Sequence, residues 1–239
     1  MSGHSKWAKT HRQKSVQDAK KGAIFTKIAN LITIAARESG GDQETNFKLR
    51  LAVDKARNAN MPKDNIERAI SKGVGANKDG ASFEEVVYEI IGPGGTGFIA
   101  EAITDNKNRT IADLKSVLNK NGGQLGSANS VAWNFKRKGI ILLENKNLND
   151  DSELAIIDAG ADDIIKESDY WQIVTSPENL MAVAGRLKNN GFDLKESSLS
   201  YLPKEEIKIS NPLDQEKIEK FYNAIDDLDD ISNVYTNAN

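Results

Sequence analysis

The chain has 239 residues and no cysteine, and its 35 Asp and Glu against 32 Lys and Arg give a formal net charge of −3 at pH 7. The lack of cysteine excludes disulfides and Cys-ligated zinc or iron–sulfur sites and agrees with a reducing compartment, so we expect a cytoplasmic protein without a metal. The longest apolar run, residues 31–36, is too short for a membrane span, and the length suits two or three domains.

Charge is divided unevenly along the sequence. Residues 1–78 hold 16 Lys and Arg but 7 Asp and Glu, a net charge of +9, whereas the rest of the chain carries a net charge of −12. In residues 1–30, seven basic residues are set against Asp18 alone. This asymmetry favours a polyanionic partner for the basic part; the alternative is a solvated surface that balances an acidic body.

Apolar residues recur at helical spacing in the first part of the chain. We predict an amphipathic helix over residues 16–37, a second helix over 47–56, and a third that begins at Pro62 and stops at Gly73. The first module is therefore three helices behind a basic N-terminal arm. Residues 74–82 are rich in Gly, Asn and Asp and form the boundary.

From there onward the apolar period changes from helix-like to strand-like. We predict strands at 83–91 and 97–104, followed by a helix over 110–121 in which Thr110 and Asp113 are spaced as a capping box.

A weak internal repeat appears when the sequence is shifted by 69 residues, because a helix, an Asn-Gly stop and a strand then coincide. The inner copy has the order βαββαβ, which is the ferredoxin-like plait. Its predicted elements are a strand at 140–144, a helix at 152–159, strands near 163–167 and 170–175, a helix from Pro177 capped by Ser176, and a strand at 194–201.

This inner copy interrupts an outer module of the same kind. The predicted outer elements are strands at 97–104 and 130–136 around the helix at 110–121, then strands at 205–210 and 231–236 around a helix at 213–228. The predicted fold class is α+β: an N-terminal three-helix domain with a basic arm, followed by two ferredoxin-like α/β domains, the second inserted within the first. The predicted domains are residues 1–78, residues 79–138 together with 204–239, and residues 139–203.

Two loops carry patterns that are associated with phosphate binding. Residues 92–97 match G-x-G-x-x-G, but a strand follows them, so a hairpin turn is favoured over a dinucleotide loop. Residues 104–110, "TDNKNRT", lie between a strand and a helix start, where free N–H groups, Lys107 and Arg109 favour an anion. Simple capping by Asn108 or Thr110 is the alternative, and the two can coexist.

Two other patterns have ordinary structural explanations. Trp133 and Phe135 alternate on a predicted strand and could stack bases, but without an RNP-type motif core packing is favoured. The acidic stretch from Asp226 to Asp230 lacks the spacing of a calcium loop, so a turn or a contact with a basic partner is favoured over a metal site.

Catalytic motifs find little support in the sequence. The two histidines, His4 and His11, both lie in the polar arm, and no Walker loop, G-x-S-x-G or H-E-x-x-H occurs. Carboxylate pairs stay possible, but we expect a protein that is not an enzyme and that binds no cofactor and no small-molecule substrate.

Several long motifs together resemble the YebC family of bacterial proteins and their mitochondrial relatives. They are "MSGHSKWAKTHRQKS", "QDAKKGAIFTKI", "RLAVDKARNANMPKDNIERAI", "GPGGTG", "TDNKNRT", "NGGQLG" and "LDDISNVYTN". The resemblance implies three domains, one inserted in another, and a role in gene expression. Members of this family are described as DNA-binding transcriptional regulators, and others as translational activators that act with ribosomes, notably where proline runs stall synthesis.

We therefore expect a non-enzymatic nucleic-acid binder that grips backbone phosphates, with DNA or ribosomal RNA as the partner, possible contact with the ribosome, and no membrane. The alternative is a ribosome-associated translation factor that relieves stalling with the same surface. The expected contact residues are Lys6, Trp7, Lys9, His11, Arg12, Lys14, Lys20, Lys21, Lys27, Lys107 and Arg109.

Overall fold

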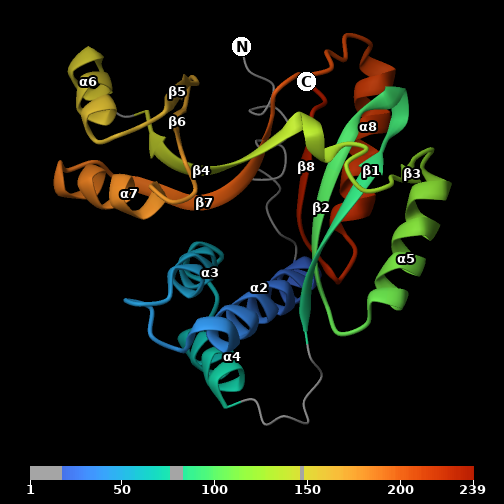
Figure 1. Cartoon of the computed structure of the whole chain (residues 1–239), viewed down its shortest axis with the longest axis horizontal. Coiled ribbons are helices and arrows are strands. Elements are labelled where there is room, and N and C mark those ends of the chain that lie inside the picture. The colour runs from blue at the N-terminus through green and yellow to red at the C-terminus, as the bar shows by residue number, and fades with distance from the viewer. Residues whose placement is uncertain (1–17, 76–82, 146–147) are drawn as a thin grey trace. The chain divides into compact units, whose positions relative to one another are not determined.

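The computed structural model describes residues 18–75, 83–145 and 148–239, with side chains from Gly22 onward (Figure 1). The chain divides into two compact units, one built from the residues up to Phe135 together with Pro203–Asn239, the other from Lys136–Leu202. In these residues, helices are followed by two four-stranded sheets with helices of their own, which confirms the α+β fold class. The three predicted domain boundaries stay a prediction.

In the described residues, the first unit begins with three helices, as expected. They are α2 (Asp18–Ser39), α3 (Phe47–Asn58) and α4 (Lys63–Val74). Asn46 starts α3, because its side-chain oxygen accepts a hydrogen bond from the N–H of Leu49 at 3.0 Å. Its amide Nδ2 donates to the carbonyls of Ala35 and Gly40, each at 2.7 Å, so one buried side chain fixes the turn between α2 and α3.

Helix α4 packs closely against α2. Thr33 of α2 donates its hydroxyl to the carbonyl of Ala69 in α4 at 3.2 Å. A Cβ added to Gly73 of α4 would lie 2.5 Å from the carbonyl oxygen of Thr33 and 2.7 Å from the Cβ of Ala36. Glycine at position 73 therefore permits the close approach of the two helices.

The first sheet is antiparallel, with the order β3-β1-β2-β8. Its strands are β1 (Glu84–Ile91), β2 (Gly97–Thr104), β3 (Gln124–Leu125) and β8 (Ile231–Thr236). The glycine-rich residues 92–97 join β1 to β2 as a hairpin with a 3₁₀ turn at Pro93–Gly95, as predicted, and Gly94 and Gly95 both have positive φ.

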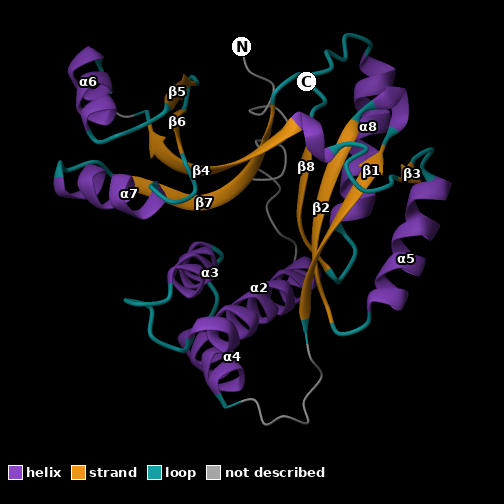
Figure 2. Ribbon diagram, in the orientation of Figure 1, coloured by secondary structure: helices purple, strands orange, loops and turns teal. Residues whose placement is uncertain are grey.

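One face of this sheet is covered by α5 (Lys107–Lys120) and α8 (Pro212–Asp226), which Figure 2 shows beside the strands. Leu114 and Leu118 of α5 and Phe221 of α8 are fully buried there. The rings of Phe221 and Phe98 meet edge to face with their centroids 5.0 Å apart. Apolar burial at helical spacing thus holds both helices on the sheet.

Two predicted outer strands are wrong. Residues 132–134 form a 3₁₀ turn, and the strand that follows, β4 (Phe135–Glu144), belongs to the second sheet, so β3 takes the edge of the first sheet instead. Residues 205–210 form one isolated bridge, between Ile207 and Ala238, because their backbone pairs with the last residues of the chain.

The second sheet has the order β5-β6-β4-β7 and confirms the predicted βαββαβ succession. Its other elements are β5 (Asp163–Lys166), β6 (Tyr170–Thr175), β7 (Leu194–Pro203), α6 (Asp150–Asp158) and α7 (Leu180–Asn189). Helix α6 begins two residues before the prediction because Asn149 and Ser152 form a capping box. Ile141, Ile156, Ile173 and Leu187 are fully buried in this unit. None of the helices in the described residues is long and apolar enough to cross a membrane.

The close approach of α4 to α2 generates a stability prediction. Gly73→Ala is expected to lower the free energy of unfolding by about 1–3 kcal/mol, because the new methyl group has no space against the backbone of α2. Gly22→Ala is the matched control: nothing lies within 4 Å of its added Cβ, so this helical substitution is expected to raise stability by about 0.5–1 kcal/mol. Urea unfolding of both variants checks the pair, and equal stabilisation would contradict the packing.

Candidate nucleic-acid interface

The predicted contact residues fall into three groups. Lys20 and Lys21 lie in the first turn of α2, Lys27 lies further along the same helix, and Lys107 and Arg109 lie in the first turn of α5. The arm residues lie outside the described part of the chain: Lys6, Trp7, Lys9, His11, Arg12 and Lys14.

The start of α2 combines two sources of positive potential. The N-terminal end of a helix carries the positive end of the macrodipole, and Lys20 and Lys21 sit in its first turn. Cations at this end cost a helix a few tenths of a kcal/mol each, and Asp18 in the same turn offsets part of this cost. Attraction of an anion to this turn stays a prediction.

Lys27 makes a contact within the chain. Its ammonium donates to the backbone carbonyl of Asp226, the last residue of α8. The last carbonyls of a helix have no intrahelical partner, and a lysine side chain can supply one. Burial lowers the pKa of Lys27, against the opposing effect of the nearby carboxylates of Asp226, Asp227 and Asp229. Lys27 therefore ties α2 to the end of α8.

The loop before α5 is closed by its own polar groups. Asn106 is the cap of α5: its side-chain oxygen accepts a hydrogen bond from the N–H of Arg109 at 3.1 Å, and its own N–H donates to the hydroxyl of Thr104 at 2.8 Å. The helix thus begins three residues before the predicted start, and the predicted capping box of Thr110 and Asp113 is wrong. Thr110 instead lies inside the helix and is buried.

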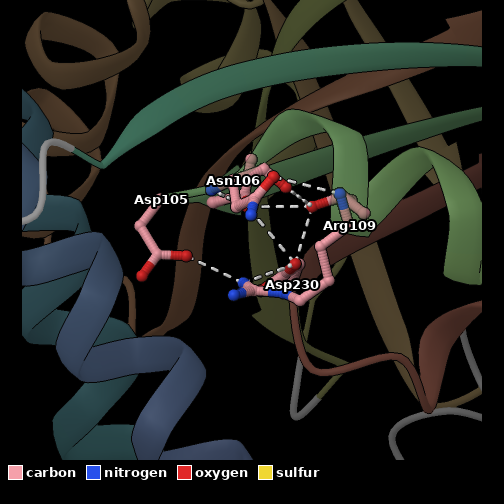
Figure 3. Close-up of polar contacts among 6 residues, drawn as sticks. Asp105, Asn106, Arg109 and Asp230 are labelled. Carbon is pink, nitrogen blue, oxygen red and sulfur yellow. Dashed lines mark hydrogen bonds and ion pairs between the residues drawn. The ribbon is translucent and has the colours of Figure 1, made fainter.

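Asp230 is the counter-ion of this loop (Figure 3). Both of its carboxylate oxygens lie 3.0 Å from Nη2 of Arg109, and Thr110 donates its hydroxyl to Oδ2 at 2.6 Å. Arg109 also pairs with Asp105 at 2.8 Å, and the hydrogen bonds to Asp230 and Asp105 raise its pKa.

Lys107, the second cation of the loop, pairs with Glu84 at 2.6 Å. Two cations are therefore set against three carboxylates, those of Glu84, Asp105 and Asp230. Both cations of this loop therefore pair with carboxylates of the chain, and the cap is Asn106 rather than Asn108 or Thr110. An anion contact here stays a prediction, because a cap and a phosphate contact can coexist.

We call residues 226–230 the acidic turn. It joins α8 to β8, receives Lys27 through the carbonyl of Asp226 and receives Arg109 through the carboxylate of Asp230. The carbonyl of Asp230 also accepts the N–H of Ile103 in β2 at 2.8 Å. The sequence left the role of this segment open, and no local pattern could reveal it because its partners lie more than a hundred residues away along the chain.

The structure also corrects the expectation for the aromatic pair. Phe135 is buried as predicted, but 53% of Trp133 is exposed, so core packing is wrong for Trp133. The alternation that suggested a strand arises from the 3₁₀ turn Ala132–Asn134, which turns Val131 inward and Trp133 outward.

Glu89 of β1 holds the backbone of this turn. Its carboxylate accepts hydrogen bonds from the N–H groups of Asn129, Val131 and Ala132, at 2.6, 2.7 and 2.7 Å. Burial pushes the pKa of Glu89 upward, but the three donors outweigh it and the net shift is downward.

Taken together, the fold and the site define a class of protein. It is an α+β protein in which a positively charged N-terminal segment precedes an acidic body. Lys27, Lys107 and Arg109 contact groups of the chain itself. Two protein-family models match the sequence, and both describe the same family. The TACO1/YebC protein N-terminal domain matches residues 5–76, and the TACO1/YebC second and third domain matches residues 83–238. The chain belongs to the TACO1/YebC family.

Known proteins resemble the chain over nearly its full length. A probable transcriptional regulatory protein of Thermoanaerobacter pseudethanolicus is 47% identical over 100% of this chain and 97% of its own. Another, of Pseudothermotoga lettingae, is 46% identical over 99% of this chain and 93% of its own. A crystal structure of a conserved hypothetical protein of Aquifex aeolicus has a TM-score of 0.85 and 36% identity, covering 95% of this chain and 93% of that one.

The network at Asp230 predicts unequal costs for two of its donors, Thr110 and Arg109. Thr110→Val removes a buried hydroxyl that donates to a carboxylate, and we expect a loss of about 1–3 kcal/mol in the free energy of unfolding. Arg109→Gln is expected to cost less, because the guanidinium is exposed and its ion pairs are screened by solvent. Urea unfolding of both variants tests this order, and the reverse order would show that the ion pair dominates.

The contacts of Glu89 predict a pH dependence. Glu89→Gln is expected to cost about 1–3 kcal/mol at pH 7, because an amide accepts hydrogen bonds less well than a carboxylate and its NH₂ faces the same donors. The pKa of Glu89 is lowered in the folded state, so its contribution is present above the ordinary value of 4.5 and is lost as pH falls below it. The difference in the free energy of unfolding between the wild type and Glu89→Gln should therefore become smaller as the pH falls.

Thermal unfolding between pH 7 and pH 3 measures this difference. Glu85→Gln is the matched control, since Glu85 lies on the same strand but is exposed. A pH-independent cost for Glu89→Gln would contradict the assignment of the carboxylate as the acceptor of the turn.

Proposed function

We propose that this protein is a regulator of gene expression of the TACO1/YebC family that binds nucleic acid through backbone phosphates and catalyses no reaction. The names of its relatives, probable transcriptional regulatory proteins, support a regulatory role. The observation that carries the binding proposal is the charge distribution, with a net charge of +9 over residues 1–78 against −12 over the rest.

The structure supports a division of labour among the cations. Lys27, Lys107 and Arg109 contact groups of the chain itself, although the exposed ion pairs of Lys107 and Arg109 add little to stability. The remaining predicted residues lie in the arm and in the first turn of α2, and we assign the phosphate contacts to them. They are Lys6, Trp7, Lys9, His11, Arg12, Lys14, Lys20 and Lys21, with Trp7 stacking or wedging against the bound strand.

Phosphate contacts of this kind fix position without reading sequence. The acidic body as a whole is repelled by the same polyanion, so it meets the nucleic acid over a narrow surface at most or turns towards proteins. A partner bound mainly by shape and charge fits this arrangement, and both duplex DNA and structured ribosomal RNA are of that kind.

Sedimentation distinguishes the two candidate partners, ribosomal RNA and DNA. If the nucleic acid is ribosomal RNA, tagged protein should co-sediment with ribosomal particles in a lysate and lose this association on nuclease treatment or on deletion of the arm. If it is DNA, the protein should stay at the top of the gradient and shift promoter fragments in a gel assay.

Salt dependence tests the proposed phosphate contacts. With about five contacts, the logarithm of the affinity should fall with the logarithm of salt concentration at a slope of roughly −3.5 to −4.5. Fluorescence anisotropy on labelled duplex DNA and structured RNA measures the slope. The combined variant Lys6→Gln, Lys9→Gln, Arg12→Gln and Lys14→Gln should flatten it by about 3.

A control with the same change in charge neutralises four exposed lysines of α5 and α8 and should leave the slope unchanged. These lysines are Lys115, Lys120, Lys217 and Lys220. An unaltered slope in the arm variant, or an equal loss in the control, would remove the arm from the mechanism.

A further inference from the structure

Trp133 is the one aromatic residue among the large apolar side chains that are exposed in the described part of the chain. Single exposed aliphatic residues are common on protein surfaces and need no explanation. Trp133 differs from them because the backbone that carries it is held in place from several sides.

The turn around Trp133 is braced by side chains from two distant segments. Glu89 accepts three of its N–H groups, as described above. Asn134 donates to the carbonyl of Glu205 at 2.8 Å and accepts the N–H of the same residue at 2.9 Å. Gly126 lies so close that an added Cβ would come within 2.2 Å of the hydroxyl of Ser130. Trp133 is therefore presented from a fixed turn.

The exposed part of Trp133 is its apolar ring. The indole N–H is already satisfied, because Nε1 donates to the carbonyl of Ser130 at 3.2 Å. A tryptophan whose polar atom is bonded within the chain offers a partner a π surface and no hydrogen bond. This surface suits stacking better than polar recognition.

Positive charge accompanies the ring. The ammonium of Lys204 donates to the backbone carbonyl of Trp133, and Lys204 is exposed. Lys136 and Arg137 belong to the other compact unit, so Lys204 is the cation that the first unit itself supplies here. An aromatic surface next to cations is the combination that binds single-stranded nucleic acid.

We propose that Trp133 is a stacking platform for an unpaired base of the bound nucleic acid, with Lys204 close to the adjoining phosphate. This inference rests on the proposed function and deepens it, since it adds a contact with bases to the phosphate contacts of the arm. A nucleobase fits better than a protein side chain because the exposed surface is a flat ring without a free hydrogen-bond donor, and the ammonium of Lys204 lies at the backbone of the same residue. Every base has a π face, so the contact tolerates many sequences.

Binding to three matched probes tests the proposal. They are a hairpin with an unpaired loop, the same hairpin with abasic loop residues, and a fully paired duplex, each prepared as RNA and as DNA. The wild-type protein should bind the loop hairpin about 5- to 100-fold more tightly than the abasic one. Trp133→Ala should abolish this preference and leave affinity for the duplex and the salt slope unchanged, whereas Trp133→Phe should keep most of it.

Trp7→Ala is measured in parallel, because Trp7 is the other residue proposed to stack against the bound strand. Thermal unfolding verifies that each variant is folded. If the preference for unpaired bases is absent in the wild type, or survives in Trp133→Ala, the stacking proposal is overturned while the proposed function stands. If the wild type binds none of the probes, both are overturned. If Trp133→Ala binds all probes normally but loses a nuclease-resistant protein partner, the surface contacts protein and the stacking proposal is wrong.

Discussion

The first unit of this protein depends on how the acidic turn is satisfied. The turn brings backbone carbonyls and a partly buried carboxylate to the junction of α8 and β8, and such groups are costly unless they are paired. Lys27 supplies the partner from α2, Arg109 and Thr110 supply it from α5, and Ile103 supplies it from β2. Segments that are far apart in the sequence are thereby joined at one point.

This constraint separates the cations of the chain into two populations. Lys27 and Arg109 contact the acidic turn, and Lys107 pairs with Glu84. These three cations lie beside acidic groups of the chain itself. They reduce the repulsion among the carboxylates of the acidic body, because their charge is partly neutralised there. The cations of the arm have no acidic residue near them in sequence until Asp18, which is why we propose that they act on a partner.

Local patterns were enough to predict most elements of the fold. Strands 97–104 and 231–236 were predicted to the residue, because apolar alternation and flanking turn residues mark them clearly. The start of α5 was missed because Asn106, Asn108 and Thr110 are all good caps by local criteria. What decides between them is the carboxylate of Asp230, which draws Thr110 into the helix from 120 residues away.

The same limit explains Trp133, and it also shows why its exposure is informative. Val131 and Phe135 are both buried, as they would be on one face of a strand, so apolar spacing alone could not reveal the 3₁₀ turn at residues 132–134. The turn forms because Glu89 gathers three N–H groups that a strand would have directed to a neighbour. Because the carboxylate of Glu89 holds this turn, the indole of Trp133 is kept in solvent and contributes little stabilisation through burial. That cost is understandable if the ring is covered only when a partner is bound.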